Sequence, residues 1–225
     1  MRSRSVGEVV LRGTVDVPAP PARLVADWSR DIVERLALEP GDVEALSLPR
    51  ARMRWPDYRQ CVQAAANWTA AHGLQNLLAD AEVALMVCRG ARYHHDGARY
   101  GSAAFCNLFL SEDRGLDLHF PSIDLRIPLA SGTMVVFDTG QPHAVVQRGS
   151  SGFDVADFPA DLDCTQVFLT WELPVEHADV ARALGVEFDV DPGATSLLDV
   201  EQVWSSGARV EVCPQSGRWC WPEEA

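Results

Sequence analysis

The first third of the chain carries apolar residues at helical spacing. Between residues 21 and 38 the large apolar side chains recur every four positions, at Leu24, Trp28, Ile32 and Leu36. That period predicts an amphipathic helix, and the two prolines at positions 20 and 21 are a typical helix start. A second stripe predicts a helix over residues 56–72, which ends before a glycine. Together these patterns predict a helical layer ahead of the rest of the chain.

From residue 82 onward, short apolar or alternating runs are separated by turn residues, which predicts strands. The expected strands span residues 83–88, 102–110, 116–120, 123–129, 134–137, 144–146 and 165–173, with a further short one at 9–11. Residues 116–120 and 123–127 alternate strictly, so each strand has one buried and one wetter face. Several such strands predict a mostly β fold, an antiparallel barrel or jelly roll, with the N-terminal helices packed on one sheet.

Length and composition favour one domain. The chain has 225 residues, of which 47% are hydrophobic and 23% charged, the proportions of an ordinary globular protein. Residues 1–80 are expected to be helical support, 81–174 the β core and 175–225 a C-terminal extension. The extension predicts a short helix over 175–184 and a closing hairpin at Ser216-Gly217. A long loop over residues 148–164, rich in Gly, Ser, Asp and Pro, is expected to cover a site.

Charge excludes several classes of partner. Nineteen basic residues stand against 32 acidic ones, a formal net charge of -13, so nucleic acid and anionic membrane surfaces are disfavoured. The sequence contains no lysine, which excludes Schiff-base chemistry and the lysine of phosphate-binding loops. Any cationic side chain that binds an anionic ligand is therefore an arginine. A small-molecule substrate, an amino acid or a basic peptide fits this balance.

Cysteine usage and the start of the chain predict a cytoplasmic protein. The six cysteines form no CxxC pair, and their separations match no zinc-site spacing. The first residues lack the apolar run of a secretory signal, and no stretch has the roughly 18 consecutive apolar residues of a membrane span. Free thiols in a reducing compartment are expected, and the oligomeric state stays open.

Candidate chemistry gathers after the strand predicted at 83–88. His94 and Asp96 are two residues apart, so on an extended segment both side chains point the same way and can bind one cation. An imidazole and a carboxylate are two of the three ligands of the facial triad that binds Fe(II). His143 comes immediately before the strand predicted at 144–146. It is the candidate third ligand.

Four motifs occur in a fixed order along the β region. They are HHD at 94–96, RGLDL at 114–118, PLASGTMVVF at 128–137 and PHAV at 142–145. In this order they resemble the 2-oxoglutarate- and Fe(II)-dependent oxygenases of the double-stranded β-helix fold, in particular the prolyl-hydroxylase-like branch. The resemblance covers residues 82–173, less than half of the chain.

The resemblance implies an enzyme. His94, Asp96 and His143 would hold Fe(II), with 2-oxoglutarate and O2 as co-substrates. An unactivated C–H bond of a small molecule or an amino-acid side chain would be hydroxylated, with release of succinate and CO2. Asp96 disfavours halogenation, because relatives that halogenate carry Gly or Ala at this position. A peptide or protein hydroxylase is the alternative within the family.

Two other classes stay open. One is a cupin-like metalloenzyme that uses no 2-oxoglutarate, and the other is a binding module whose barrel has lost catalysis. The first stays open because the sequence has no arginine at the position where the family binds the far carboxylate of 2-oxoglutarate. The resemblance puts this arginine six residues before a tryptophan, and Thr165 stands six residues before Trp171.

Arg148, the first arginine after His143, is the leading candidate for this role. Arg148 stands five positions after His143, however. On a regular strand the two side chains would therefore point to opposite faces, unless a bulge intervenes. The other candidates are Arg92, Arg99 and Arg126.

Further residues have expected roles by position. The resemblance implies that Tyr93 and Asn107 line the co-substrate pocket. Thr165 is expected to offer a hydroxyl to the co-substrate. His95, between the first two ligands, is expected to point away from the metal. His119 lies on the polar face of its strand and is expected to be exposed.

Overall fold

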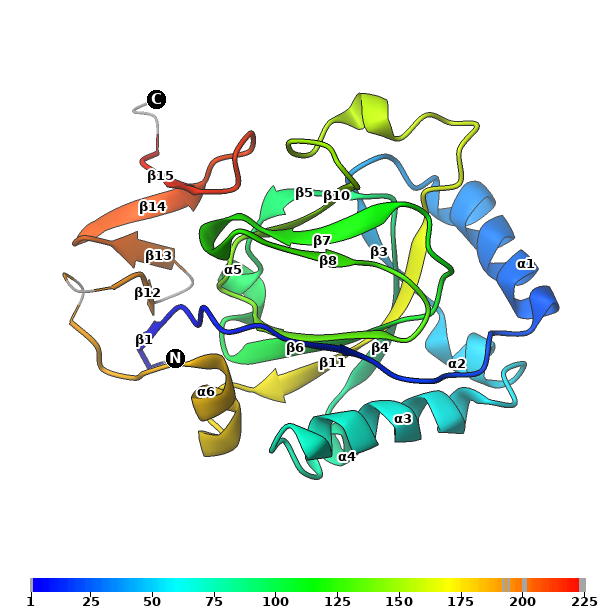
Figure 1. Ribbon diagram of the computed structural model, residues 1–225, viewed down its shortest axis with the longest axis horizontal. Helices are drawn as coiled ribbons and strands as arrows, with labels where there is room; N and C mark the ends of the chain where they lie inside the picture. Colours follow the sequence, from blue (N-terminus) through cyan, green and yellow to red (C-terminus); the bar gives the residue numbers. More distant parts are fainter. Residues whose placement is uncertain (1, 192, 194, 200–201, 223–225) are drawn as a thin grey trace.

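Alternating apolar side chains fold the central strands into two facing antiparallel sheets (Figure 1). In this computed structural model, which describes residues 2–191, 193, 195–199 and 202–222, the protein is mostly β with few helices. The larger sheet has the strand order β2 (Leu11–Thr14), β9 (Thr133–Asp138), β6 (Ala103–Phe109), β11 (Gln166–Pro174), β4 (Val83–Cys88) and β3 (Val43–Leu46). The smaller sheet has the order β5 (Ala91–His94), β10 (His143–Gln147), β7 (Leu116–Phe120) and β8 (Leu125–Pro128).

Each central strand of the larger sheet divides its side chains between two cores. On β6, Cys106 and Leu108 face the helices, whereas Phe105 and Phe109 face the smaller sheet. The space between the sheets is filled mainly by apolar side chains, with Phe137 of β9 among them. This alternation fixes which residues can reach the interior, because successive side chains on a strand point to opposite faces.

Helices cover the outer face of the larger sheet. They are α1 (Ala22–Asp31) with the π-helical turn Ile32–Leu36, α2 (Leu48–Arg52), α3 (Tyr58–Ala71) and α4 (Leu77–Asp80). Trp28 of α1 meets Trp55 edge to face, with ring centroids 5.6 Å apart. The buried residues of these helices and the outer face of the sheet form one continuous core. Among the described helices, none has the length and apolarity that a membrane crossing requires.

A third sheet joins both ends of the chain. β1 (Arg4–Ser5) pairs with β12 (Leu197–Asp199), followed in order by β13 (Gln202–Ser205), β14 (Ala208–Val212) and β15 (Trp219–Cys220). This sheet lies beside α5 (Gly97–Tyr100), at the left of Figure 1, and its strands β12 to β15 follow α6 (Ala178–Leu184) in the chain. Short 3-10 turns occur at Pro121–Ile123 and Val155–Asp157. The pairing of β14 with β15 confirms the hairpin predicted at Ser216-Gly217.

Strongly periodic segments were the predictable ones. The strands expected at 83–88 and 116–120 coincide with β4 and β7, and the helices expected over 21–38 and 56–72 contain α1 and α3. The sequence pattern misses β3 and β5, because each has only four residues, VEAL and ARYH, and neither has a clear apolar run. Residues 1–80 are therefore more than helical support, since β2 and β3 form the two edges of the larger sheet.

Candidate metal centre

Three residues with metal-binding side chains meet where β5 ends and β10 begins. His94 is the last residue of β5 and His143 is the first residue of β10. The two strands are antiparallel neighbours, and these two histidines are register partners. Asp96 follows two residues after His94, at the N-terminal cap of α5. Strand pairing thus brings together residues that are far apart in the chain.

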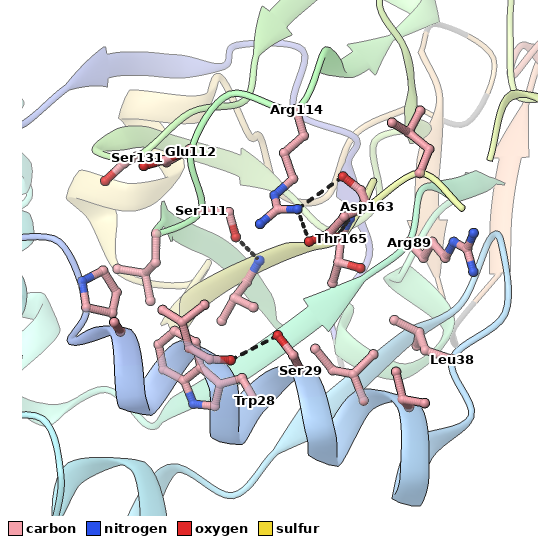
Figure 2. Close-up of a pocket in the computed structure, with 18 of the residues that line it drawn as sticks. Trp28, Ser29, Leu38, Arg89, Ser111, Glu112, Arg114, Ser131, Asp163 and Thr165 are labelled. Atoms are coloured by element: carbon pink, nitrogen blue, oxygen red, sulfur yellow. Dashed lines mark hydrogen bonds and ion pairs between the residues drawn. The ribbon is translucent and has the colours of Figure 1, made fainter. Parts of the chain in front are cut away.

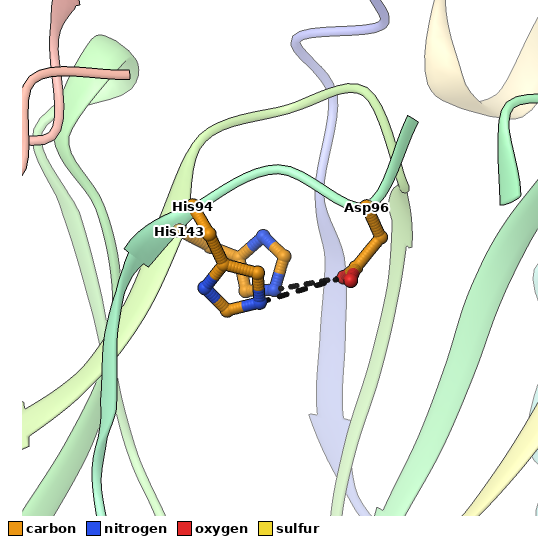
Figure 3. A group of neighbouring side chains, drawn as sticks. All are labelled: His94, Asp96 and His143. Atoms are coloured by element: carbon orange, nitrogen blue, oxygen red, sulfur yellow. Dashed lines mark ion pairs between the residues drawn. The ribbon is translucent and has the colours of Figure 1, made fainter. Parts of the chain in front are cut away.

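The three side chains converge on one point (Figure 3). Asp96 Oδ2 lies 3.4 Å from His143 Nε2 and 3.7 Å from His94 Nε2. The centroids of the two imidazole rings are 4.4 Å apart. One candidate ligand atom from each residue lies within 4.8 Å of the other two. The group could therefore hold one metal ion.

Backbone carbonyl groups orient both imidazoles. His94 Nδ1 lies 2.6 Å from the Arg92 carbonyl oxygen, and His143 Nδ1 lies 2.9 Å from the Gln141 carbonyl oxygen. Each ring can therefore donate its Nδ1–H to the backbone two residues earlier and keep the Nε2 lone pair for a metal. This second hydrogen bond is typical of metal-binding histidines, whose tautomer and orientation it fixes.

Burial sets the protonation of the group. His143 is 6% exposed, and its ring centroid lies 4.8 Å from that of Phe137. Removal from water lowers the pKa of His143 well below its usual value. Burial also raises the pKa of the Asp96 carboxyl, against the opposing effect of His94. The buried imidazole of His143 is consequently neutral at pH 7, the form that binds a metal.

A buried ion pair supports the turn that leads to His143. The carboxylate of Asp138, the last residue of β9, accepts hydrogen bonds from Arg4 at 2.6 and 2.7 Å. It also accepts the backbone N–H groups of Gly7 and Gly140. The side chains of Arg4 and Asp138 are 1% and 0% exposed. The N-terminal strand is thereby tied to the candidate metal centre, a link that local sequence patterns do not contain.

The same turn holds the segment that carries Asp96. The backbone N–H of Asp96 donates to the Thr139 carbonyl oxygen at 2.7 Å. The Thr139 hydroxyl lies within hydrogen-bonding distance of the carbonyl oxygens of Tyr100 and Ala103, at 2.7 and 2.8 Å. A displacement of this turn would therefore move both Asp96 and His143.

Arg148 does not lie at the candidate metal centre. β10 runs from His143 to Gln147, so Arg148 follows at the opposite end of the strand, roughly 16 Å along it. Its guanidinium donates to the carboxylates of Asp113 and Asp117 at 2.9–3.0 Å, and these bonds lower the pKa of Asp113. The structure corrects the predicted pairing of Arg148 with 2-oxoglutarate, because two aspartates already occupy this arginine.

The other candidate arginines are exposed or face outward. Arg92 and Arg99 are exposed and lie against aromatic rings. Arg126 is the register partner of His119, on the outer face of the smaller sheet. The strands β4, β6, β7, β9, β10 and β11, all of whose residues are described, contain no arginine. These six strands therefore supply no cation for a bound carboxylate. Arg12 of the edge strand β2 is the register partner of Val135, so this exposed arginine lies on the inner face of the larger sheet.

Two further expectations are corrected on the outer face of the smaller sheet. Tyr93, expected in the co-substrate pocket, precedes His94 and points to the opposite face, where its hydroxyl lies 2.7 Å from His119 Nδ1. His119, expected to be exposed, is 8% exposed. Tyr93 and C-terminal residues such as Val212 pack on this face and exclude water from it. Burial lowers the pKa of His119.

The C-terminal extension packs behind the candidate metal centre. The ring centroid of His95 lies 5.6 Å from that of Trp219 on β15, which agrees with the expectation that His95 points away from the metal. Gly217 has a φ of +69° and lies against Tyr93 and Pro121, so a side chain at this position would collide with them. Residues of the extension thus form a wall of the molecule beside the site.

A cavity of about 950 Å³ opens at the other end of the two sheets (Figure 2). One wall is the face of α1 that includes Trp28 and Ser29, and the opposite wall contains Arg114, Asp163 and Thr165. Its rim includes the turn after β6, at the end of that strand remote from the candidate metal centre. Thr165, expected to bind the co-substrate, lines this cavity instead.

The loop over residues 148–164, expected to cover a site, is anchored by packing. Phe158 is 2% exposed and inserts into the core between the sheets. Its carbonyl oxygen accepts a hydrogen bond from Arg89 at 3.0 Å. Phe158 thus holds its part of the loop at the end of the molecule remote from the candidate metal centre, whereas Gly152 and Phe153 lie against Tyr93, next to His94.

Among the four predicted pocket residues, only Asn107 faces the space between the sheets. It is 6% exposed, and its Oδ1 has no hydrogen-bond partner. Gln166 and Thr170 of β11 share this inner face with Phe168, and each also has a buried side-chain oxygen without a partner. The sequence analysis named neither Gln166 nor Thr170, although their even spacing from Phe168 on a single strand was a usable signal.

No protein-family model and no curated protein matches the chain. A viral collagen prolyl hydroxylase from Paramecium bursaria Chlorella virus-1, as a 2OG complex, matches over 74% of this chain and 96% of its own, with 9% identity and a TM-score of 0.43. A Pseudomonas putida prolyl-4-hydroxylase matches over 73% and 92%, with 19% identity and a TM-score of 0.40. EvdO2 from Micromonospora carbonacea var. aurantiaca matches over 76% and 87%, with 15% identity and a TM-score of 0.44.

The similar solved structures include prolyl hydroxylases and 2-oxoglutarate-dependent enzymes. One of them is SnoN, an alpha-ketoglutarate-dependent epimerase from nogalamycin biosynthesis, with 13% identity and a TM-score of 0.37. Likeness at this level leaves the function to be inferred from the side chains of the site.

Proposed function

We propose that the protein is an Fe(II)-dependent oxygenase that uses a 2-oxo acid as co-substrate and hydroxylates an unactivated C–H bond. The observation that carries this proposal is the convergence of His94, Asp96 and His143, with both imidazole Nε2 atoms directed at one carboxylate oxygen. Two imidazoles and one carboxylate are the donor set of non-haem Fe(II) oxygenases. The order of the four sequence motifs points to the same class.

The strand order supports a double-stranded β-helix as the scaffold. From β4 to β7 and from β8 to β11, successive strands alternate between the larger and the smaller sheet. Such a scaffold presents the first residue of β10 and the last residue of β5 at one open end of the barrel. That end is where His143 and His94 lie.

The residues present fit an Fe(II) ion. Their ligand atoms lie within 4.8 Å of one another, and hydrogen bonds to the backbone hold both histidines in the tautomer that a metal needs. A bound Fe(II) would supply redox chemistry with O2, and three protein ligands on one face leave the opposite face for other ligands. The rings of Phe137 and Phe120, with centroids 4.8 and 6.0 Å from that of His143, pack beside this imidazole.

The overall reaction balances with a 2-oxo acid. One O2, one 2-oxo acid and one C–H bond give CO2, a carboxylic acid shorter by one carbon and an alcohol. The residues described here do not fit every 2-oxo acid equally. The second carboxylate of 2-oxoglutarate would lie between sheets whose central strands contain no arginine, in a chain without lysine.

The lack of an arginine in the described residues of these central strands supports a second candidate, a cupin-like metalloenzyme that uses no 2-oxoglutarate. For either candidate, the formal charge of -13 supports a small molecule, an amino acid or a basic peptide as substrate. We place a small molecule first, and nucleic acid is disfavoured.

The proposal is tested by CO2 release. The apoprotein is loaded with Fe(II) without oxygen, supplied with a panel of 2-oxo acids and then exposed to O2. We expect slow, Fe(II)-dependent CO2 release from the wild type and from Asp113→Ala, which removes a surface carboxylate bound to Arg148. Asp96→Ala should release none. If the wild type binds Fe(II) but releases no CO2 with any 2-oxo acid, the second candidate replaces the first.

A further inference from the structure

Two cysteines share the outer face of the C-terminal hairpin, which β14 and β15 form (Figure 1). The register of these strands sets Glu211 opposite Cys220. The N–H of Cys213 donates to the Arg218 carbonyl oxygen, so the ladder continues one residue beyond β14. Successive side chains on a strand point to opposite faces, so Cys213 lies on the face of Glu211, which is also the face of Cys220. The two cysteines are therefore diagonal neighbours across the hairpin.

This face of the hairpin is open to solvent. Val212 and Trp219 point the other way, the first toward Tyr93 and the second into the core of the third sheet. Cys213 and Cys220 are both partly exposed. The other four cysteines are buried, and they are Cys61, Cys88, Cys106 and Cys164. Removal from water raises the pKa of each of these four thiols, so an oxidant in solution reaches the hairpin cysteines first.

The two thiols of the hairpin are in contact and differ in their surroundings. Hydrogen bonds from the Ser216 hydroxyl and from the backbone N–H groups of Ser216 and Gln215 lower the pKa of the Cys213 thiol, and the Cys220 thiol adds to this effect. Cys220 Sγ also lies 3.5 Å from the Glu211 carbonyl oxygen, an acceptor that favours the protonated thiol. Because the thiolate is the reactive form, Cys213 is the better nucleophile and Cys220 is the thiol beside it.

We infer that Cys213 and Cys220 are a redox-active pair that a hydroperoxide oxidises to a disulfide across the hairpin. The Cys213 thiolate first attacks one peroxide oxygen, the O–O bond breaks, and the other oxygen leaves as an alcohol or water while Cys213 becomes a sulfenic acid. The Cys220 thiol then attacks the Cys213 sulfur, the S–S bond forms, and the sulfenic hydroxyl leaves as water with the proton of the thiol. Two thiols thus lose two electrons to one hydroperoxide.

The disulfide closes a segment that lies beside the candidate metal centre. Gly217, between the two cysteines in sequence, lies against Tyr93, which precedes a candidate ligand. Trp219 lies against His95, which stands between two candidate ligands. A cross-link reduces the number of conformations open to the unfolded segment, so oxidation stabilises this wall of the site. The inference concerns the thiols alone and does not depend on the use of a 2-oxo acid.

Peroxide treatment followed by tryptic digestion tests the bond directly. The full chain is treated with hydrogen peroxide in the absence of iron, and the remaining thiols are blocked with iodoacetamide before unfolding and digestion. Trypsin cleaves after arginine, and Arg218 lies between the two cysteines, so the reduced protein releases residues 210–218 and 219–225 as separate peptides. After peroxide we expect these peptides to stay linked, with two hydrogen atoms lost, and to separate when a dithiol is added.

Matched cysteine variants assign the two roles. Cys220→Ser should stop at the sulfenic acid of Cys213, which dimedone labels. Cys213→Ser should react with peroxide about tenfold more slowly than the wild type. Cys164→Ala, which changes a buried cysteine, is the control and should form the disulfide at the wild-type rate. Peroxide should also raise the urea midpoint of the wild type and of this control, but not that of Cys220→Ser.

Several results would overturn the inference. One is oxidation that joins separate chains, seen as a dimer on a non-reducing gel, in place of the linked hairpin peptides. Another is an equal rate of peroxide reaction in the wild type and in Cys213→Ser. Loss of the buried thiols as fast as the hairpin thiols would also contradict it. None of these results concerns the metal ligands, so the proposed function is tested separately.

Discussion

Asp138→Asn perturbs the candidate metal centre without touching a metal ligand. In the wild type the Asp138 carboxylate accepts two hydrogen bonds from Arg4 and two from backbone N–H groups. The amide keeps the size of the side chain but removes its charge, so the guanidinium of Arg4, 1% exposed, stays buried without its counter-ion. Breaking one partner of such a buried pair costs about 3–5 kcal/mol. That is a large part of the roughly 5–15 kcal/mol by which a domain is stable.

Urea unfolding of the metal-free protein measures this loss, and Mn(II) titration measures its effect on the site. Residues that hold metal ligands in place typically contribute about 10–100-fold to metal affinity. We therefore expect weaker Mn(II) binding in Asp138→Asn, because the turn after Asp138 leads to His143 and contacts Asp96. Arg2→Met, which breaks an exposed pair with Asp189, is the control and should change neither quantity.

A double replacement separates the effect of Asp138 on protein stability from its effect on the position of the candidate metal ligands. Arg4→Met combined with Asp138→Leu removes both buried charges, and such replacements are often neutral or stabilising. We expect the double variant to recover only part of the free energy of unfolding, because the buried N–H groups of Gly7 and Gly140 lose their acceptor, and not to recover the Mn(II) affinity. The reasoning is refuted if Asp138→Asn loses less than about 1 kcal/mol, or if its Mn(II) affinity equals that of the wild type.

Other perturbations have smaller or more local effects. Arg148→Ala should leave Mn(II) affinity unchanged in calorimetry and lower the free energy of unfolding by about 1–3 kcal/mol, because the buried carboxylate of Asp117 loses its guanidinium partner. The part of this loss that comes from the exposed pair with Asp113 should vanish in acid, as the pH falls through the lowered pKa of Asp113. Gly217→Ala should lower the free energy of unfolding by about 1–3 kcal/mol, because its φ of +69° and its contact with Tyr93 leave no room for a methyl group; equal urea midpoints would contradict this. Burial lowers the pKa of His119, so the folded state resists its protonation and stability should fall as the pH drops below about 6.5; a pH series of urea unfolding on His119→Gln should show a shallower fall.

Local periodicity predicted the strands and the pairing of His94 with Asp96 for a common reason. A strand fixes the direction of its side chains with a period of two residues, so the spacing of His94 and Asp96 carries geometric information. His143 could be proposed because it stands at the start of a recognisable strand. Joining His143 to the other two also needed the order of the four motifs along the chain, and the structure brings the three residues together.

The predictions that failed needed knowledge of distant contacts. Arg4 and Asp138 are paired across 134 positions, and no periodic pattern joins them. His119 was expected to be exposed because it alternates with apolar residues, but the C-terminal extension buries that face. Arg148 was expected at the site because it is near His143 in sequence, yet a strand of five residues places it at the far end.

The central claim is that three side chains form one metal site, and metal titration tests it most directly. Fe(II) or Mn(II) is titrated without oxygen into the wild type, His94→Ala, Asp96→Ala and His143→Ala. His72→Ala, which removes an exposed histidine next to α3, is the matched control. We expect one ion per chain in the wild type and in the control, and a large loss of affinity in each of the other three. Unchanged affinity in the three variants would contradict the assignment of the site.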